Sequence, residues 1–276
     1  MLEIRTLRKP HVLPLKESVS QPAFLALSIF SGISFFLIAI ALLPVFAFIW
    51  LVSLLFDRDR LLLHSLSNWC VHKFLVANPL IQCRFEGLSN LRMNQPCVIV
   101  ANHQSVIDIL VLCGLPGNFK WIAKRSIFQI PAIGWIMRMG GDVCLVAKSV
   151  SGGRRMFRQG TEWLKRKVSV VIFPEGTRSE SGELLTFKDG PFRLATACGV
   201  PVVPIAIEGT AAILPKYSKM PHPRGVIRVS VLPAVYPNDY HHNAAALRDA
   251  VRADIGRRLK EMRSNGTAAL EASSQS

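Results

Sequence analysis

The sequence predicts an α/β fold in which helices cover a mixed, mostly parallel sheet, preceded by a hydrophobic membrane-anchoring helix or helical hairpin. Two observations lead to this prediction. From about residue 65 onward, short apolar runs alternate with helix-like segments at the spacing typical of strand–helix units. Before them, residues 22–56 form a continuous apolar stretch without one ionisable side chain, which is typical of a membrane segment.

The apolar stretch is 35 residues long, whereas a helix needs about 20 apolar residues to cross a bilayer. It also exceeds the apolar core of a signal peptide, which has about 7–15 residues. Pro44 lies well inside it and is expected either to kink one span or to divide a re-entrant pair of helices. Basic residues precede it (Arg5, Arg8, Lys9, Lys16) and the rest of the chain is also basic. The positive-inside rule therefore places both ends in the cytoplasm and favours a hairpin.

The elements of the sheet and its helices follow from local composition. Six apolar runs are predicted to be strands: 97–102, 119–123, 143–147, 168–173, 200–207 and 226–232. Four segments between them are predicted to be helices: 105–113, 126–139, 152–166 and 190–198. Pro201 and Pro204 suggest that their strand lies at an edge or a bend of the sheet.

Near the end of the chain, Leu247, Val251, Ile255 and Leu259 recur every four residues between basic side chains. This pattern predicts an amphipathic helix. The remaining tail, 263–276, is rich in small and polar residues and is predicted to be disordered.

Composition limits the possible partners. The chain has 33 Lys+Arg against 18 Asp+Glu, a formal net charge of +15, which suits nucleic acid, an anionic lipid surface or a phosphorylated substrate. Half of the residues are hydrophobic and the mean hydropathy is +0.31, so a membrane surface is favoured over nucleic acid. The six cysteines show no CxxC spacing, so neither a zinc site nor a disulfide framework is indicated.

Segment 126–139 is apolar on nearly every side around Pro131 and Gly134. Basic residues flank it, as at a membrane interface (Lys120, Lys124, Arg125, Arg138). Its composition fits a helix in the protein core equally well.

The stretch "NHQSVID", residues 102–108, places chemistry at the end of a predicted strand, where α/β sheets bind their ligands. Ser105 and Asp108 have the spacing of a capping box at the start of a helix, but a cap gives no reason for His103. In the functional interpretation, Asp108 orients the imidazole and stabilises the imidazolium formed when His103 takes a proton. Because no serine or cysteine nucleophile is evident beside it, the proton is expected to come from the substrate.

A second stretch, "VIFPEGTRS" at 171–179, also follows a predicted strand, and Pro174 and Gly176 turn the chain there. Glu175 and Arg178 then lie at the same edge as His103 if both strands are parallel. An arginine on a tight turn suits a two-pronged grip on phosphate, whereas an exposed Glu–Arg pair in a loop is often only a surface ion pair. Downstream, Lys188 and Arg193 add positive charge.

These motifs together resemble those of the glycerolipid (lysophospholipid) acyltransferase family. The family's first block, His-x4-Asp, matches 102–108 and its third matches "FPEGTRS" at 173–179, about 70 residues later. Its fourth, an apolar stretch with proline, matches 200–207. The second block departs: in "MGGDVCLVAKS", 139–149, Leu145 replaces Phe and Lys148 stands where the family has Arg. Lysine keeps the charge but not the two-pronged geometry.

The resemblance implies that His103 and Asp108 are catalytic, with His103 as the general base. It also implies that Glu175, Gly176, Thr177, Arg178 and Lys148 bind the acceptor phosphate. A fatty acyl group would pass from acyl-CoA or acyl-carrier protein to the sn-2 hydroxyl of lysophosphatidic acid, giving phosphatidic acid. No metal ion, prosthetic group or nucleic acid is implied.

The expected organisation is a basic segment (1–21), a membrane anchor (22–64), an acyltransferase domain (65–262) and the disordered tail. The enzyme is expected at the cell inner membrane, with its catalytic domain on the cytoplasmic side and bound to anionic lipid. Other acceptors stay open, namely glycerol 3-phosphate, another lysophospholipid or lyso-ornithine lipid. A hydrolase using the same base is an alternative, although no G-x-S-x-G elbow is present. A catalytically silent membrane-binding module is a further alternative, but the polar motifs are intact.

Overall fold

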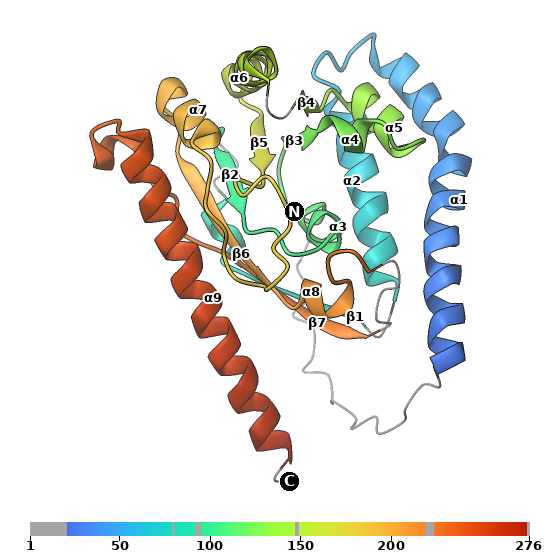
Figure 1. Ribbon diagram of the computed structural model, residues 1–276. Helices are drawn as coiled ribbons and strands as arrows, with labels where there is room; N and C mark the ends of the chain where they lie inside the picture. The colour runs from blue at the N-terminus through green and yellow to red at the C-terminus, as the bar shows by residue number, and fades with distance from the viewer. Residues whose placement is uncertain (1–20, 79–80, 92–94, 147–148, 219–223, 275–276) are drawn as a thin grey trace.

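The computed structural model describes residues 21–78, 81–91, 95–146, 149–218 and 224–274. The described part of the chain begins with two helices, α1 (Gln21–Ser53) and α2 (Leu61–Val76), which lie side by side and antiparallel (Figure 1). The basic segment 1–21 lies outside the described residues except for Gln21.

The apolar stretch forms one continuous helix. Pro44 lies inside α1 without dividing it, so the helical hairpin within 22–56 is not formed and the single hydrophobic helix is confirmed. Among the described residues, Gly32–Ser53 is the one helical stretch long and apolar enough to cross a membrane by length and composition. Large apolar side chains along α1 are exposed, among them Phe30, Leu37 and Phe48. Such a surface marks a membrane or a protein as its neighbour.

Helix α2 crosses the expected boundary between anchor and domain at 64/65. Its side chains at Leu63, His64 and Leu75 are buried, so α2 belongs to the packed body of the protein and also contacts α1.

Seven strands form one sheet in the order β1-β7-β6-β2-β5-β3-β4. Every neighbouring pair is parallel except β6 and β7, which confirms the mixed, mostly parallel sheet. The strands are β1 (Ile81–Glu86), β2 (Val98–Ala101), β3 (Phe119–Lys124), β4 (Val143–Leu145), β5 (Ser169–Ile172), β6 (Val202–Glu208) and β7 (Gly225–Val231).

Two details of the sheet differ from the sequence prediction. Strand β1 was missed because it is an edge strand whose half-exposed, polar residues, "IQCRFE", lack an apolar run. Strand β6 is interior rather than at an edge. Pro204 lies one residue beyond the β6–β7 register, which begins at Ile205. Its carbonyl accepts the N–H of Leu232 at 2.8 Å, and proline is tolerated there because the regular ladder has ended. Its missing N–H therefore faces the end of that ladder.

Helices cover both faces of the sheet (Figure 1). One core layer joins Ile99 and Ala101 of β2 to α2 and to α3 (Ile107–Leu112). The other joins Val98 and Val100 of the same strand to the opposite helices, which are α6 (Val150–Lys165), α7 (Gly190–Cys198) and α9 (Ala244–Ser274). Both faces of β2 are thus buried, as in parallel sheets generally.

Three further elements are short. They are the 3-10 turns η1 (Leu88–Asn90) and η2 (Pro237–Tyr240) and the helix α8 (Thr210–Ile213).

The helix expected over 126–139 is broken into α4 (Arg125–Phe128) and α5 (Ile133–Gly140). The break follows from Pro131 and from Ala132, which has a φ of 63°. Phe128 is buried in the core whereas Trp135 is 54% exposed, so the core interpretation holds for part of the segment and the membrane interface stays a prediction.

The four apolar positions of the predicted C-terminal helix are all buried in α9. The helix continues to Ser274, where a disordered tail was expected from Arg263 onward. The tail sequence "TAALEA" contains good helix formers and no proline, which lets the helix extend.

Candidate active site

His103 and Asp108 form a hydrogen-bonded pair at the carboxyl end of β2. His103 Nδ1 lies 2.8 Å from Asp108 Oδ2, and the aspartate side chain is fully buried. The same oxygen accepts the backbone N–H groups of Gln104 at 2.7 Å and Ser105 at 2.8 Å. Three donors on one carboxylate oxygen hold it in a single position. With Nδ1–H directed at the carboxylate, Nε2 is the ring nitrogen left to accept a proton.

Only one half of the predicted capping box is formed, because Val106 rather than Ser105 is the N-cap residue of α3. Asp108 reaches back to the N–H of Ser105, and Ser105 Oγ accepts the N–H of Ile107 at 3.2 Å. Regular helix begins only at Ile107, and Ser105 Oγ additionally donates to the Leu214 carbonyl at 2.7 Å. The carboxylate therefore serves both the helix start and the imidazole.

An aromatic wall supports the imidazole. The rings of His103 and Phe173 stack with centroids 3.9 Å apart and an interplanar angle of 11°. Behind Phe173 lies Trp121 of β3, with ring centroids 6.3 Å apart. The sequence analysis missed this role of Phe173, although Phe173 is the first residue after β5 and β5 pairs with β2.

Glu175 is buried against backbone rather than exposed in its loop. Its Oε1 accepts the N–H of His103 at 2.8 Å and its Oε2 accepts the N–H of Leu185 at 3.1 Å. Burial raises the pKa of Glu175 to about 7, and the two backbone hydrogen bonds oppose that rise. The surface Glu175–Arg178 ion pair considered above is not formed, because both carboxylate oxygens are turned inward.

The rest of the "FPEGTRS" turn surrounds the backbone of His103. Ser179 N donates to the His103 carbonyl at 2.7 Å, so the turn holds this residue through both of its peptide groups. Gly176 has a φ of 66°, and a Cβ there would lie 2.8 Å from Lys188 Nζ. The turn thus requires glycine and brings Lys188 close. Thr177 is exposed and Arg178 is half-buried.

A cluster of lysines lies at the same edge of the sheet. The pKa of Lys124, at the end of β3, is lowered by burial and then by the nearby charges of Lys188 and Lys216. Lys216 also contacts Glu180 at 2.9 Å. Lys124 and Lys216 were not predicted as site residues, because they are distant in sequence from both motifs. Lys148, which was predicted, lies outside the described residues.

Comparison with known proteins gives the class to which this arrangement belongs. A family model described as "Acyltransferase" matches residues 82–208, the stretch that holds β1 to β6 and both motifs. A 1-acyl-sn-glycerol-3-phosphate acyltransferase of Chlamydomonas reinhardtii is 35% identical over 90% of this chain and 74% of its own length. The chain belongs to the 1-acyl-sn-glycerol-3-phosphate acyltransferase family.

Two further comparisons agree. The chloroplastic 1-acyl-sn-glycerol-3-phosphate acyltransferase BAT2 of Brassica napus is 40% identical over 66% of this chain, which spans about half (53%) of that relative's length. The crystal structure of the 1-acyl-sn-glycerophosphate (LPA) acyltransferase from Thermotoga maritima superimposes with a TM-score of 0.71 and 27% identity. It covers 87% of this chain and 98% of the other.

Proposed function

We infer that the protein transfers a fatty acyl group from a thioester, acyl-CoA or acyl-carrier protein, to the sn-2 hydroxyl of lysophosphatidic acid, giving phosphatidic acid. The observation that carries this proposal is the His103–Asp108 pair at the carboxyl edge of the sheet, whose N and O atoms are 2.8 Å apart and whose imidazole stacks on Phe173. The names of the relatives support the choice of acceptor.

In the proposed reaction, His103 Nε2 removes the proton from the acceptor hydroxyl as its oxygen attacks the thioester carbonyl carbon. The tetrahedral intermediate then expels the thiolate, which takes the proton back from the imidazolium. The C–S bond is broken, the C–O ester bond is formed, and His103 is neutral again. Asp108 stabilises the imidazolium while it exists, and Phe173 keeps the ring in its plane.

The acceptor phosphate is assigned to the positive charge beside this pair. Arg178 is half-buried on the turn. Lys188 is close enough to Lys124 for its charge to add to the effect of burial in lowering the pKa of Lys124. Gly176 and Thr177 complete the turn, and Lys148 stays a prediction. Arginine supplies the two-pronged contact with phosphate and the lysines supply charge.

Glu175 was predicted among the phosphate-binding residues, and its geometry favours a different role. Both of its oxygens accept backbone N–H groups, one of them from His103 itself. We assign it as a positioning residue that acts through His103.

The proposed location is the cytoplasmic face of the cell inner membrane. Helix α1 presents an apolar surface along its length, and the formal net charge of +15 favours an anionic lipid surface. An enzyme held there meets its lipid acceptor in the leaflet and its soluble donor from the cytoplasm.

The test is acyl transfer by the detergent-solubilised full chain, with lysophosphatidic acid, glycerol 3-phosphate and a lyso-aminolipid as alternative acceptors. We expect phosphatidic acid from lysophosphatidic acid and none from the His103→Ala variant. Equal activity of that variant would remove the proposed base, and a preference for a phosphate-free acceptor would overturn the acceptor assignment.

A further inference from the structure

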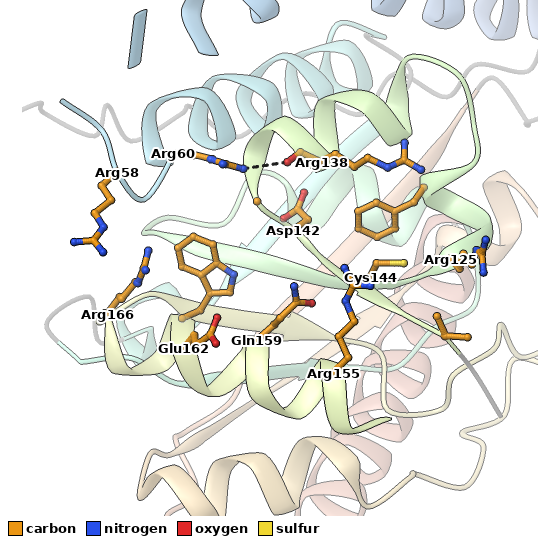
Figure 2. A pocket seen from close by; sticks show the side chains of 14 residues that line it. Arg58, Arg60, Arg125, Arg138, Asp142, Cys144, Arg155, Gln159, Glu162 and Arg166 are labelled. Atoms are coloured by element: carbon orange, nitrogen blue, oxygen red, sulfur yellow. Dashed lines mark hydrogen bonds between the residues drawn. The ribbon is translucent and has the colours of Figure 1, made fainter. Parts of the chain in front are cut away.

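A second concave region lies away from His103, along the outer edge of β4 between α5 and α6 (Figure 2). It is a cavity of about 650 Å³, within the range of about 300–1,000 Å³ that small-molecule sites occupy. We call it the arginine groove, because six of its lining residues are arginines: Arg58, Arg60, Arg125, Arg138, Arg155 and Arg166.

The arginines come from four separate segments of the chain. Arg58 and Arg60 lie in the turn between α1 and α2, and the others belong to α4, α5 and α6 or its end. Figure 2 shows Arg58 and Arg166 toward one end of the groove and Arg125 and Arg155 toward the other. Convergence of cations from distant parts of the chain requires an explanation, since like charges repel.

Protein carboxylates neutralise only part of this charge. Two line the groove, Asp142 and Glu162, and Asp142 is buried beneath it with its side chain 4% exposed. Asp59 pairs with Arg166 at 2.9 Å. Within the described part of the chain, no carboxylate contacts Arg58, Arg125 or Arg155. The groove therefore has spare guanidinium groups for an anion, and guanidinium forks match phosphate oxygens.

The wall formed by α6 is regular. Arg155, Gln159, Glu162 and Arg166 follow one another at helical spacing and share the face toward the groove. The neighbouring Arg154 is exposed but does not line the groove, which makes it a matched control. At the far end, the guanidinium of Arg166 lies over the Trp163 ring, 5.4 Å from its centroid, and offers a flat cationic surface.

The groove is within reach of the catalytic pair. Arg125 directly follows β3, and the order β2-β5-β3-β4 places β3 two strands from His103. At the usual strand spacing this is about 10 Å sideways, and about 15 Å to β4. A pantetheine arm has the backbone length of about four residues, on the order of 14 Å when extended.

We propose that the arginine groove binds the phosphorylated nucleotide end of a coenzyme A thioester donor. The inference rests on the proposed function and assigns the donor side of the same reaction. The pantetheine arm would run from the Arg125 end of the groove across the carboxyl edge of the sheet to His103. Coenzyme A carries three phosphate groups, which suits the several unpaired guanidinium groups.

The shape of the region favours this ligand over two others. An acyl-carrier protein holds its acyl chain on a phosphopantetheine without the nucleotide, and a folded protein docks on an exposed surface more readily than inside a cavity. The headgroup of phosphatidylglycerol has one phosphate group and does not require cations from both ends of an elongated groove.

The experiment compares Arg125→Gln, Arg155→Gln and the double variant with the control Arg154→Gln in the detergent-solubilised full chain. Binding of adenosine 3′,5′-bisphosphate is measured by calorimetry, independently of activity. Kinetics are measured with acyl-CoA, with acyl-pantetheine, which lacks the nucleotide, and with acyl-carrier protein.

We expect each groove variant to weaken bisphosphate binding and to raise the KM for acyl-CoA about 10-fold, as for the loss of one charged hydrogen bond. The advantage of acyl-CoA over acyl-pantetheine should fall by the same factor, while Arg154→Gln keeps the wild-type ratio. A misfolded variant would lose activity with every donor, so this ratio separates ligand binding from folding.

Other outcomes would overturn the assignment. Bisphosphate affinity equal in the groove variants and Arg154→Gln would remove the nucleotide site. The groove would be a lipid site if the groove variants bound phosphatidylglycerol vesicles less well than the wild type, relative to phosphatidylcholine vesicles, and kept their bisphosphate affinity. A KM effect confined to acyl-carrier protein would make it a docking surface. If the proposed function is wrong, no donor supports transfer, whereas failure of this inference alone leaves His103-dependent transfer intact.

Discussion

The backbone N–H of His103 donates to Glu175 Oε1 at 2.8 Å, although the two residues are 72 positions apart in the chain. Glu175 also accepts the N–H of Leu185, so one buried carboxylate connects His103, the proposed base, to two parts of the loop after β5. The two sequence motifs are thus joined by a direct hydrogen bond between the backbone of the first and a side chain of the second, and not only through a shared ligand.

This arrangement predicts the kinetic signature of Glu175→Gln. The amide keeps one acceptor for His103 N but presents a donor toward Leu185 N, so the loop shifts and His103 loses its orientation. We expect kcat to fall on the order of 10-fold or more with little change in the KM for lysophosphatidic acid. Steady-state kinetics across acceptor concentrations measure this. A raised KM with unchanged kcat would instead assign Glu175 to phosphate binding.

Glu175 also predicts a pH dependence of stability. Folding raises the pKa of Glu175 from 4.5 to about 7, so between these values the folded state holds a proton that the unfolded state has released. The stability contributed by this carboxyl is present below pH 4.5 and is lost as pH rises through about 7. Relative to Glu175→Gln, the wild type should lose on the order of 1–3 kcal/mol between pH 4.5 and pH 8. Thermal unfolding in detergent at both pH values measures this, and parallel pH profiles would contradict it.

Asp108→Asn should impair catalysis more than binding. In the wild type, one carboxylate oxygen accepts Nδ1–H of His103 and two backbone N–H groups. The neutral amide oxygen of asparagine is a weaker acceptor for all three. We expect kcat to fall about 100-fold or more, with the imidazole free to adopt the other tautomer. The rate of acyl transfer measures this. Circular dichroism is needed as a control for folding, because the substitution also weakens the hydrogen bonds at the start of the helix. Near-wild-type kcat in a folded variant would show that Asp108 is only a helix cap.

The lysine cluster predicts an acceptor-specific effect. Lys124→Gln removes one charge of the cluster that Lys124 forms with Lys188 and Lys216, so the KM for lysophosphatidic acid should rise on the order of 10-fold. Lys260→Gln, which removes an exposed charge on α9, is the matched control. Kinetics at two ionic strengths test the electrostatic origin. Salt should raise the KM for lysophosphatidic acid more in the wild type than in Lys124→Gln. Equal KM values in the two variants would exclude Lys124 from the phosphate site.

A buried lysine predicts a stability effect. Lys120 is fully buried, and its Nζ donates to the Arg60 carbonyl at 3.1 Å and the Gly140 carbonyl at 2.7 Å. Burial lowers the pKa of Lys120 to about 8. Lys120→Met would leave the Gly140 carbonyl unpaired, leave the Arg60 carbonyl with only the N–H of His64 at 3.3 Å, and remove the cation near Asp142. Together these losses should cost about 3 kcal/mol. Denaturant titration in detergent measures this. The exposed Lys165→Met should change stability by less than about 0.5 kcal/mol, and a similar change in both would contradict the role of Lys120.

The sequence predicts those parts of the site that depend on neighbours in the chain. His103 and Asp108 are five positions apart, and the strand before them places both at the sheet edge, so their pairing follows from local pattern. Six strands follow from apolar runs for the same reason. The orientation of Glu175 could not be predicted, because it depends on backbone N–H groups supplied by His103 and by the loop at Leu185.

Other features depend on contacts between distant segments. The stacking of Phe173 on His103 arises from the pairing of β2 with β5. The interior position of β6 was missed because Pro204 suggested an edge. Only the register with β7, which begins at Ile205, shows that Pro204 lies at the end of that ladder, where proline is tolerated. The arginine groove combines residues from 58 to 166, and no single stretch of sequence contains enough of them to mark it.

The bond from Lys120 to the Arg60 carbonyl has a geometric consequence for lipid selection. It ties the turn that follows α1 to β3, two strands from His103, without a flexible linker between them. With α1 embedded in a leaflet as proposed, the height of the imidazole above the acyl chains is set by the protein body. The enzyme would then select lysolipids by the depth of their free hydroxyl in the bilayer. A lysolipid whose hydroxyl lies nearer the water, or deeper in the bilayer, would not reach the imidazole.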